Sequence, residues 1–205
     1  MYTALQEQFL VHIKEKTKLW FERFPVAAHN FDHAERVAAY AMRIASAEKG
    51  NVFLSEVAAI LHDIGRVPEK YDGRTERHHE LSYELLKQWF DEDSAFDILS
   101  REEKIEILYA LRYHWCDGAD DFETAIILRD ADKLDLLGKK GMERAKEWAE
   151  EKNENLAHHI YGKFYCFYWL RKETSKRIAG QEQLMKPIDE YYINFLRQEI
   201  TDIEL

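Results

Sequence analysis

The chain has 205 residues, of which 29 are basic and 39 acidic, so its formal net charge is −10 with histidine counted as neutral. The length fits one domain, and the 8 glycines and 3 prolines, about 5% of the residues against a usual fraction of roughly 12%, argue against a turn-rich β-sandwich or barrel. The acidic balance argues against extended nucleic-acid binding, because broad nucleic-acid surfaces depend on lysine and arginine. The net charge does not exclude a small pocket that binds an anion.

Apolar residues recur at helical spacing through most of the chain, and strictly alternating runs rich in Val, Ile and Thr are missing. The sequence therefore predicts an all-α protein, with Asn30 or Asp32 capping the second helix, and with Gly65 and Pro68 ending the third before a polar loop at 66–77. We expect one compact domain over residues 1–205 that ends in a helical extension over about 155–205. The expected helices are 2–22, 30–48, 53–64, 77–90, 101–115, 122–137, 139–153, 156–178 and 182–200.

The cysteine count and the absence of long apolar runs indicate in which cellular compartment the protein is expected. Cys116 and Cys166 are the only cysteines, and they form no CxxC pair that could build a disulfide framework or a thiolate zinc site. The first 20 residues lack the apolar block of a signal peptide, and no run approaches the ~18 apolar residues of a membrane span. We expect a cytoplasmic protein with no membrane association.

The strongest candidate for chemistry is the sequence LHDIG at residues 61–65. An apolar helix that should be buried ends here in His62 and Asp63, and a buried carboxylate is costly unless it is paired or binds a metal. Adjacent helical residues diverge by about 100°, so both side chains can reach one ion at the helix end. The alternative is that both side chains only bond to backbone groups at that end.

Two further clusters combine histidine with carboxylates. Upstream, His29 and His33 are four residues apart, on one face if the helix begins early enough, and Arg36 follows three residues later. Downstream, the apolar helix around 126–137 contains three carboxylates, of which Asp132 is the one expected to turn inward. Asp130 and Asp135 either have such a role or are solvated or paired with Arg129 and Lys133.

The order His33, His62-Asp63, Asp132 resembles the HD-domain superfamily of metal-dependent phosphohydrolases, and most closely its small stand-alone bacterial members. Four stretches carry the resemblance: HxxRV at 33–37, LHDIG at 61–65, HxxxS at 78–82 and DADKLDLLG at 130–138. They cover an HD core of about 25–150. The resemblance implies an all-α helical bundle in which His33, His62, Asp63 and Asp132 bind a first divalent ion, which could be Mn, Mg, Ni, Co, Fe or Zn.

The same resemblance leaves several roles open for His78 and His114. In dinuclear members of the superfamily two further histidines bind a second ion that the HD aspartate bridges, and His78 and His114 are the candidates, with His79 next if the register shifts by one. Contact with substrate phosphate, proton transfer and a purely structural role are the alternatives. One or two ions are therefore expected.

The expected reaction is hydrolysis of a phosphate ester or anhydride in a small metabolite or nucleotide, because a divalent ion activates water and polarises phosphoryl oxygens. Asp63, Arg66 and His78 are the candidate catalytic residues. Arg36, Arg66 and Lys133 are the candidate substrate contacts, since arginine suits phosphate, although each could be an ordinary surface cation. Some nucleotidase branches have a glutamate where this chain has Arg66, so a mechanism that depends on that glutamate does not transfer.

Two other functions share this pattern. The six residues His33, His62, Asp63, His78, His114 and Asp132 also resemble the dinuclear iron oxygenases of the HD fold, and a non-catalytic regulatory HD domain is the third interpretation. The aromatic run at 161–169 is interpreted as a core helix or a homodimer interface, with a base-stacking wall as the minority interpretation. His158 and His159 are interpreted as structural.

Overall fold

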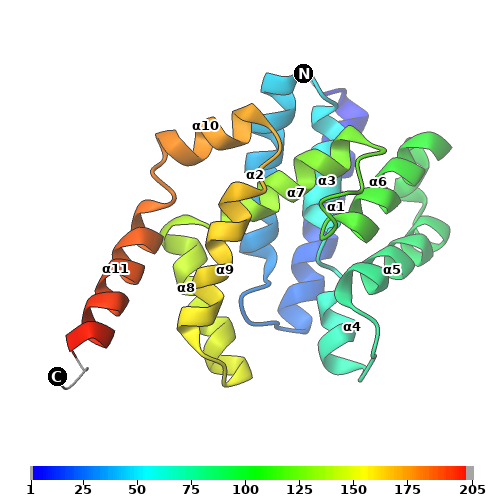
Figure 1. The fold of residues 1–205 in the computed structure, drawn as a ribbon. Coiled ribbons are helices and arrows are strands. Elements are labelled where there is room, and N and C mark those ends of the chain that lie inside the picture. Colours follow the sequence, from blue (N-terminus) through cyan, green and yellow to red (C-terminus); the bar gives the residue numbers. More distant parts are fainter. Residues whose placement is uncertain (1, 202–205) are drawn as a thin grey trace.

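The computed structural model describes residues 2–201, and within them the chain is all-α, as predicted. None of the helices in these residues combines the length and the apolar character that a membrane span requires. Figure 1 shows the helices in chain order. They are α1 (Ala4–Arg23), α2 (Phe31–Glu48), α3 (Val52–Leu61), α4 (Arg66–Tyr71), α5 (His78–Glu92), the 3-10 helix η1 (Ser94–Ile98), α6 (Arg101–Tyr113), α7 (Glu123–Asp135), α8 (Gly138–Lys152), α9 (Leu156–Tyr168), α10 (Glu173–Gln181) and α11 (Lys186–Thr201).

Helix α3 lies at the centre of the bundle and ends at the HD pair. Every residue of α3 after Val52 is buried, and α1, α2, α6 and α7 all pack against it. Asn51 caps its first turn by accepting a hydrogen bond from the backbone N–H of Leu54 at 3.0 Å. Because the helix is buried on all sides, its carboxyl end brings His62 and Asp63 into the interior instead of to the surface.

The turn after α3 is held tightly against α5 by the two ends of the HxxxS segment. The hydroxyl of Ser82 donates to the His62 carbonyl at 2.7 Å and accepts from the Gly65 N–H at 2.9 Å. A Cβ atom at Gly65 would lie 2.1 Å from the His78 carbonyl oxygen, so only glycine permits this approach. The LHDIG and HxxxS stretches therefore form one packed unit.

Two of the expected elements differ from the structure. Residues 66–71, predicted as part of a loop, form the short helix α4. Pro68 is compatible with this helix because it lies in the first turn, where a backbone N–H would have no acceptor within the helix. The expected helix 156–178 is instead α9 and α10, separated at residues 169–172. The carboxylate of Asp130 accepts hydrogen bonds from the backbone N–H groups of Arg171 and Lys172 at 2.8 to 3.1 Å, which fixes the break.

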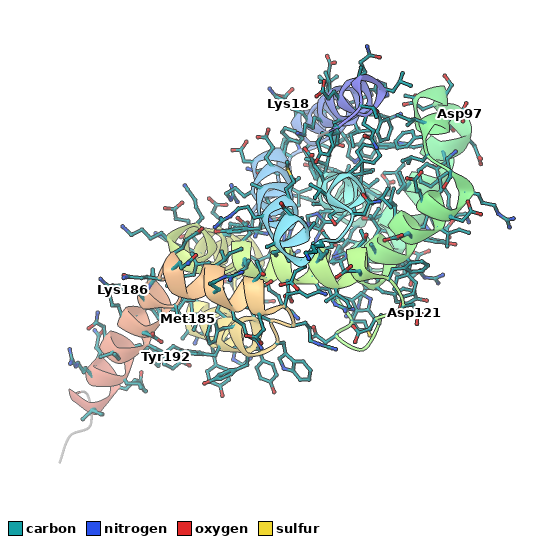
Figure 2. The ribbon with its side chains drawn as sticks, turned by 90° about the horizontal axis from the view of Figure 1, so that it is seen from above. Lys18, Asp97, Asp121, Met185, Lys186 and Tyr192 are labelled. Atoms are coloured by element: carbon teal, nitrogen blue, oxygen red, sulfur yellow. The ribbon has the colours of Figure 1, made fainter. Side chains whose placement is uncertain are left out.

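The helices after residue 155 share the main core. Ile160, Leu170, Ile178 and Ile188 are all buried in the cluster that contains α3. Helix α11 begins against α8 and α9 and then extends away from the other helices, as Figure 2 shows from above. Within the aromatic run, Phe164 and Phe167 pack on the core, whereas a second set of rings is exposed, namely Tyr161, Tyr165, Tyr168 and Trp169. A homodimer interface stays a prediction.

Candidate metal centre

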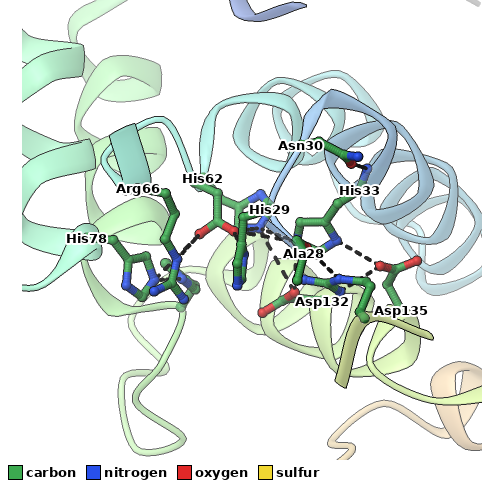
Figure 3. A network of polar contacts seen from close by, with 12 residues as sticks. Ala28, His29, Asn30, His33, His62, Arg66, His78, Asp132 and Asp135 are labelled. Carbon is green, nitrogen blue, oxygen red and sulfur yellow. Dashed lines mark hydrogen bonds and ion pairs between the residues drawn. The ribbon is translucent and has the colours of Figure 1, made fainter. Parts of the chain in front are cut away.

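Four residues from three helices surround the position expected for a first ion. His33 comes from the first turn of α2, His62 and Asp63 from the end of α3, and Asp132 from α7. The His33 Nε2 atom lies 3.2 Å from His62 Nε2, 3.5 Å from Asp63 Oδ2 and 3.4 Å from Asp132 Oδ1. Figure 3 shows the side chains of His33, His62 and Asp132 converging. Nitrogen and oxygen donors this close together can hold a divalent cation.

A second group of donors lies on the other side of Asp63. His78, the first residue of α5, and His114, the C-cap of α6, place their Nε2 atoms 3.2 Å apart. The Asp63 Oδ1 atom is 3.5 Å from His78 Nε2, whereas its Oδ2 atom faces the first group. The two oxygens of one carboxylate thus point at two histidine pairs, which is the arrangement that a bridging ligand requires.

The ring orientations of three histidines suit metal binding. The Nδ1–H of His62 donates to the Ala59 carbonyl, and that of His114 donates to the Leu111 carbonyl, both at 2.7 Å. The Nδ1–H of His33 donates to Asp135 Oδ2 at 2.7 Å. Since Nδ1 carries the proton in each ring, the lone pair on Nε2 faces the other donors, which is the usual pattern in metal-binding histidines.

Protonation also suits a cation. Burial lowers the pKa of His62, and burial together with the charge of His78 lowers the pKa of His114 to about 3. Burial raises the pKa of Asp63, but the opposing charges of His62, His29 and Arg66 hold the pKa of this carboxyl well below its usual range. Neutral imidazoles and ionised carboxylates are the forms that bind metal ions.

The environment of His33 differs. Burial lowers the pKa of His33, but its bonds to the carboxylates of Asp135 and Asp63 outweigh burial and raise that pKa above its usual value. Metal binding at His33 must therefore displace a proton from Nε2 in acidic solution, and metal affinity should fall as the pH is lowered.

His29 belongs to the site although it was not among the predicted ligands. It lies in the segment before α2, and its Nδ1 atom is 2.6 Å from Asp63 Oδ2. With His33 and Asp63 it forms a third group able to hold a cation. The spacing of four residues between His29 and His33 was the available sequence signal, but α2 begins after His29, so the two do not share a helix face.

Asp135 is the second functional residue missing from the predicted set. Its carboxylate is buried and accepts hydrogen bonds from His33, from Arg36 Nε at 2.6 Å and from Arg144 Nη1 at 2.8 Å. Burial raises the pKa of Asp135, but these bonds to His33 and Arg36 hold that pKa far below its usual range. Asp130 and Asp135 do not pair with Arg129 or Lys133: Asp135 is bonded as described above, and Asp130 accepts hydrogen bonds from the backbone N–H groups of Arg171 and Lys172, just before α10.

The predicted substrate contacts divide between two locations. Arg66 lines the cavity beside the metal-binding groups, where its Nη1 donates to Glu69 at 3.0 Å and its Nε lies 3.6 Å from Asp63 Oδ1. Glu69 also accepts from the backbone N–H of His78 at 3.0 Å, so it holds Arg66 and His78 together. Arg36 is instead bonded to Asp135, and Lys133 to Asp117 and the Trp169 carbonyl, and neither lines the cavity.

Three other histidines lie outside the three donor groups. His79 stacks on the ring of Trp115 at a centroid distance of 5.2 Å, and His159 forms an ion pair with Glu154 at 2.7 Å. His158 is exposed on the outer face of α9. Of the two candidates His78 and His79, it is therefore His78 whose Nε2 atom faces that of His114.

The metal-binding groups open into a cavity of about 440 Å³. This volume is in the range that encloses a small-molecule ligand. One side is formed by the predicted site, with Asp63, Arg66 and His78, and the opposite side by α8 and α9. The side chains from those two helices are Arg144, Ala145, Trp148, His159, Lys163 and Cys166, together with Gly162.

A sequence model of the HD domain matches residues 30–137, which is about half of the chain and contains every predicted ligand. The chain belongs to the HD-domain family. A protein described as a predicted HD-superfamily hydrolase, from an uncultured Thermotogales bacterium, is 25% identical to this HD protein, with 91% of each chain covered and a TM-score of 0.65. Together with the histidine and aspartate groups, this similarity indicates a metal-dependent hydrolase.

Two more distant structures share the fold over nearly the whole chain. Bacillus subtilis YpgQ, solved in complex with ADP, is 20% identical, covers 98% of this HD protein with 97% of its own length, and has a TM-score of 0.69. A protein from Lactobacillus plantarum is 19% identical, with coverages of 98% and 100% and a TM-score of 0.75. A search of curated proteins gave no match.

Proposed function

We propose that this HD protein is a metal-dependent phosphohydrolase that cleaves a phosphate ester or anhydride bond in a small metabolite or nucleotide. The observation that carries the proposal is the position of Asp63, whose two carboxylate oxygens face two separate histidine pairs. His33, His62 and Asp132 would hold one divalent ion with Asp63, and His78 and His114 a second. Such ions polarise phosphoryl oxygens and lower the pKa of bound water toward ~7.

The protein's own part is to position the phosphoryl group and to balance its charge. Arg66 is the cation for this role, because Glu69 holds one end of its guanidinium while the group faces the cavity next to Asp63. His78 lies between Glu69 and Asp63, with Nδ1 3.8 Å from Glu69 Oε1. The side chain is thus oriented for contact with the second ion or for proton transfer.

The cavity supports a substrate larger than a bare phosphate ion. Its volume of about 440 Å³ leaves room for a sugar or base beyond the metal-binding groups. Trp148 also lines the cavity, with its ring at a centroid distance of 5.4 Å from the ring of His29 and 5.7 Å from the guanidinium of Arg66. The ADP in the complex of Bacillus subtilis YpgQ also favours a nucleotide.

The test is elemental analysis of the purified protein, followed by a hydrolysis screen over nucleotides and sugar phosphates with Mn, Mg, Ni and Co. We expect Asp63→Asn to lose metal and to lower kcat/KM by at least 10³-fold, because it removes the charge of the one carboxylate shared by both groups. His158→Ala, at an exposed histidine outside the cavity, is the control and should match the wild type.

The same preparation separates the other two interpretations. Oxygen consumption after anaerobic iron loading, with no phosphate release under any metal, would replace hydrolysis with oxygenation. A protein that is purified without metal and is inactive with every added metal would favour a regulatory domain. Asp63→Asn with unchanged metal content and unchanged phosphate release would refute the proposed hydrolase.

A further inference from the structure

The wall of the cavity that faces the metal-binding groups comes from a part of the chain outside the HD match. On α9, the residues at positions 159, 162, 163 and 166 line the cavity. Their spacing of three and four residues places them on one face of the helix. This face brings one lysine, Lys163, into the interior of the protein.

Lys163 is buried with most of its hydrogen-bonding capacity unused. Lys163 is only 4% exposed, and its Nζ atom donates to the Leu136 carbonyl at 2.5 Å. An ammonium group has three donors. Over residues 2–201, no carboxylate lies within ion-pair distance of Lys163 Nζ, and burying a charge without a counter-charge is costly.

The other two cations that line the cavity already have carboxylate partners. Arg144 is bonded to Asp135 and to the Ala28 carbonyl, and Arg66 is bonded to Glu69. Lys163 is therefore, among the described cavity-lining lysines and arginines, the one whose positive charge is left for a ligand.

The acid–base behaviour of Lys163 agrees with this geometry. Burial lowers the pKa of Lys163 to about 8, and the nearby Arg144 lowers it too, against smaller opposing effects of Cys166 and Asp135. An anion arriving next to the ammonium group would supply the missing opposite charge and restore its preference for the protonated form.

We propose that Lys163 binds a second phosphate group of the substrate, one that lies beyond the phosphoryl group at the metal centre. This inference rests on the proposed function, since it assigns the metal-binding side of the cavity to the first phosphoryl group. Lys163 then makes the protein selective for substrates with two or more phosphates, and Arg66 and Lys163, which both line the cavity, contact different phosphates of the substrate.

The test measures binding without turnover. Titration calorimetry with Mn²⁺-loaded protein compares adenosine 5′-(α,β-methylene)diphosphate with AMP, because the two ligands share the nucleoside and differ by one phosphate-like group. We expect the wild type to bind the first ligand at least tenfold more tightly than AMP, and Lys163→Met to reduce that preference to less than threefold. Lys163→Arg keeps the charge and should retain most of the preference.

The matched control is Lys140→Met, which removes the same charge from an exposed lysine of α8 that is paired with Glu143. It should keep the wild-type preference. Equal binding of the two ligands by the wild type, or an unchanged preference in Lys163→Met, overturns the inference. Because the readout is binding, a protein that shows the Lys163-dependent preference but hydrolyses nothing contradicts the proposed function and leaves the role of Lys163 standing.

Discussion

Asp135 controls the ring of His33 without lying in any of the three donor groups. Its carboxylate accepts a hydrogen bond from the Nδ1–H of His33 and is itself held by two arginines. His33 and Asp135 are 102 residues apart in the chain, so no local pattern could connect them. The ligands were predictable because each stands in a short stretch of sequence, whereas Asp135 and His29 depend on helices that meet only in the folded protein.

Replacing Asp135 with asparagine should weaken metal binding by about 10- to 100-fold, the usual effect of losing such an orienting partner. The amide can still accept one hydrogen bond, but it leaves the buried Arg144 without its counter-charge. Competition with a chelator measures the Mn²⁺ affinity. Asp97→Asn, at a carboxylate that is 73% exposed, is the control and should retain wild-type affinity, and equal affinities in all three proteins would contradict an orienting role for Asp135.

Among the helices, those with strong apolar periodicity agree with the sequence prediction, and the differences have identifiable causes. The segment 156–178 was predicted as one helix because the carboxylate that fixes its break belongs to Asp130, 41 residues before Arg171. Helix α4 differs from the predicted loop because Pro68 does not end a helix here: it lies in the first turn of α4, where proline is tolerated. Tertiary hydrogen bonds and the position of proline within a turn decide such cases.

The contact between the HD turn and α5 makes Gly65 sensitive to substitution. In Gly65→Ala the new Cβ would meet the His78 carbonyl oxygen and, at 2.3 Å, the Ser82 nitrogen, and both are backbone atoms that cannot move without α5. We expect a loss of at least about 2 kcal/mol in the free energy of unfolding, together with weaker metal binding as His78 shifts. Urea denaturation and metal titration measure the two effects.

Gly180→Ala is the matched control, since a Cβ at Gly180 in α10 meets nothing within 4 Å. It should leave stability equal to or slightly above that of the wild type. A Gly65→Ala protein as stable as Gly180→Ala would show that α5 yields to the added methyl group without cost.

At the scale of the whole molecule, the all-α class and the HD family follow from periodicity and four short stretches of sequence. The wall formed by α8 and α9 could not be predicted from the sequence, because the run at 161–169 is mostly aromatic and the buried lysine within it belongs to no motif. The predicted subdivision into an HD core of about 25–150 and an extension stays a prediction, and the two share one hydrophobic cluster.

Lys163 should make the free energy of unfolding of the whole protein change with pH in the alkaline range. Its usual pKa is 10.5, and burial lowers it to about 8 in the folded state. Between these values the unfolded chain binds more protons than the folded protein, so the free energy of unfolding rises with pH. At about 1.4 kcal/mol per pH unit, the cost of the buried charge is roughly 3 kcal/mol at neutral pH and disappears above pH 10.5.

Lys163→Met should therefore be more stable than the wild type at pH 7 by roughly 2 kcal/mol, after loss of the hydrogen bond to Leu136 worth about 1 kcal/mol. The difference should shrink as the pH rises to 10. Urea denaturation at pH 7 and at pH 9.5 measures it, with Lys140→Met expected to follow the wild type at both. A Lys163→Met protein that is less stable at pH 7 would show that the lysine serves the fold.

Most of the cavity is lined by two stretches of chain, and Ala28, His29 and Leu136 complete it. All the proposed metal ligands lie between residues 33 and 132, whereas the facing wall lies between residues 144 and 166. We therefore expect natural variation in α9 to alter which molecule is accepted while the metal ligands stay the same. For protein engineering, grafting α9 from one relative onto another, with Arg144 of α8 kept as the partner of Asp135, should exchange substrate preference while keeping the chemistry.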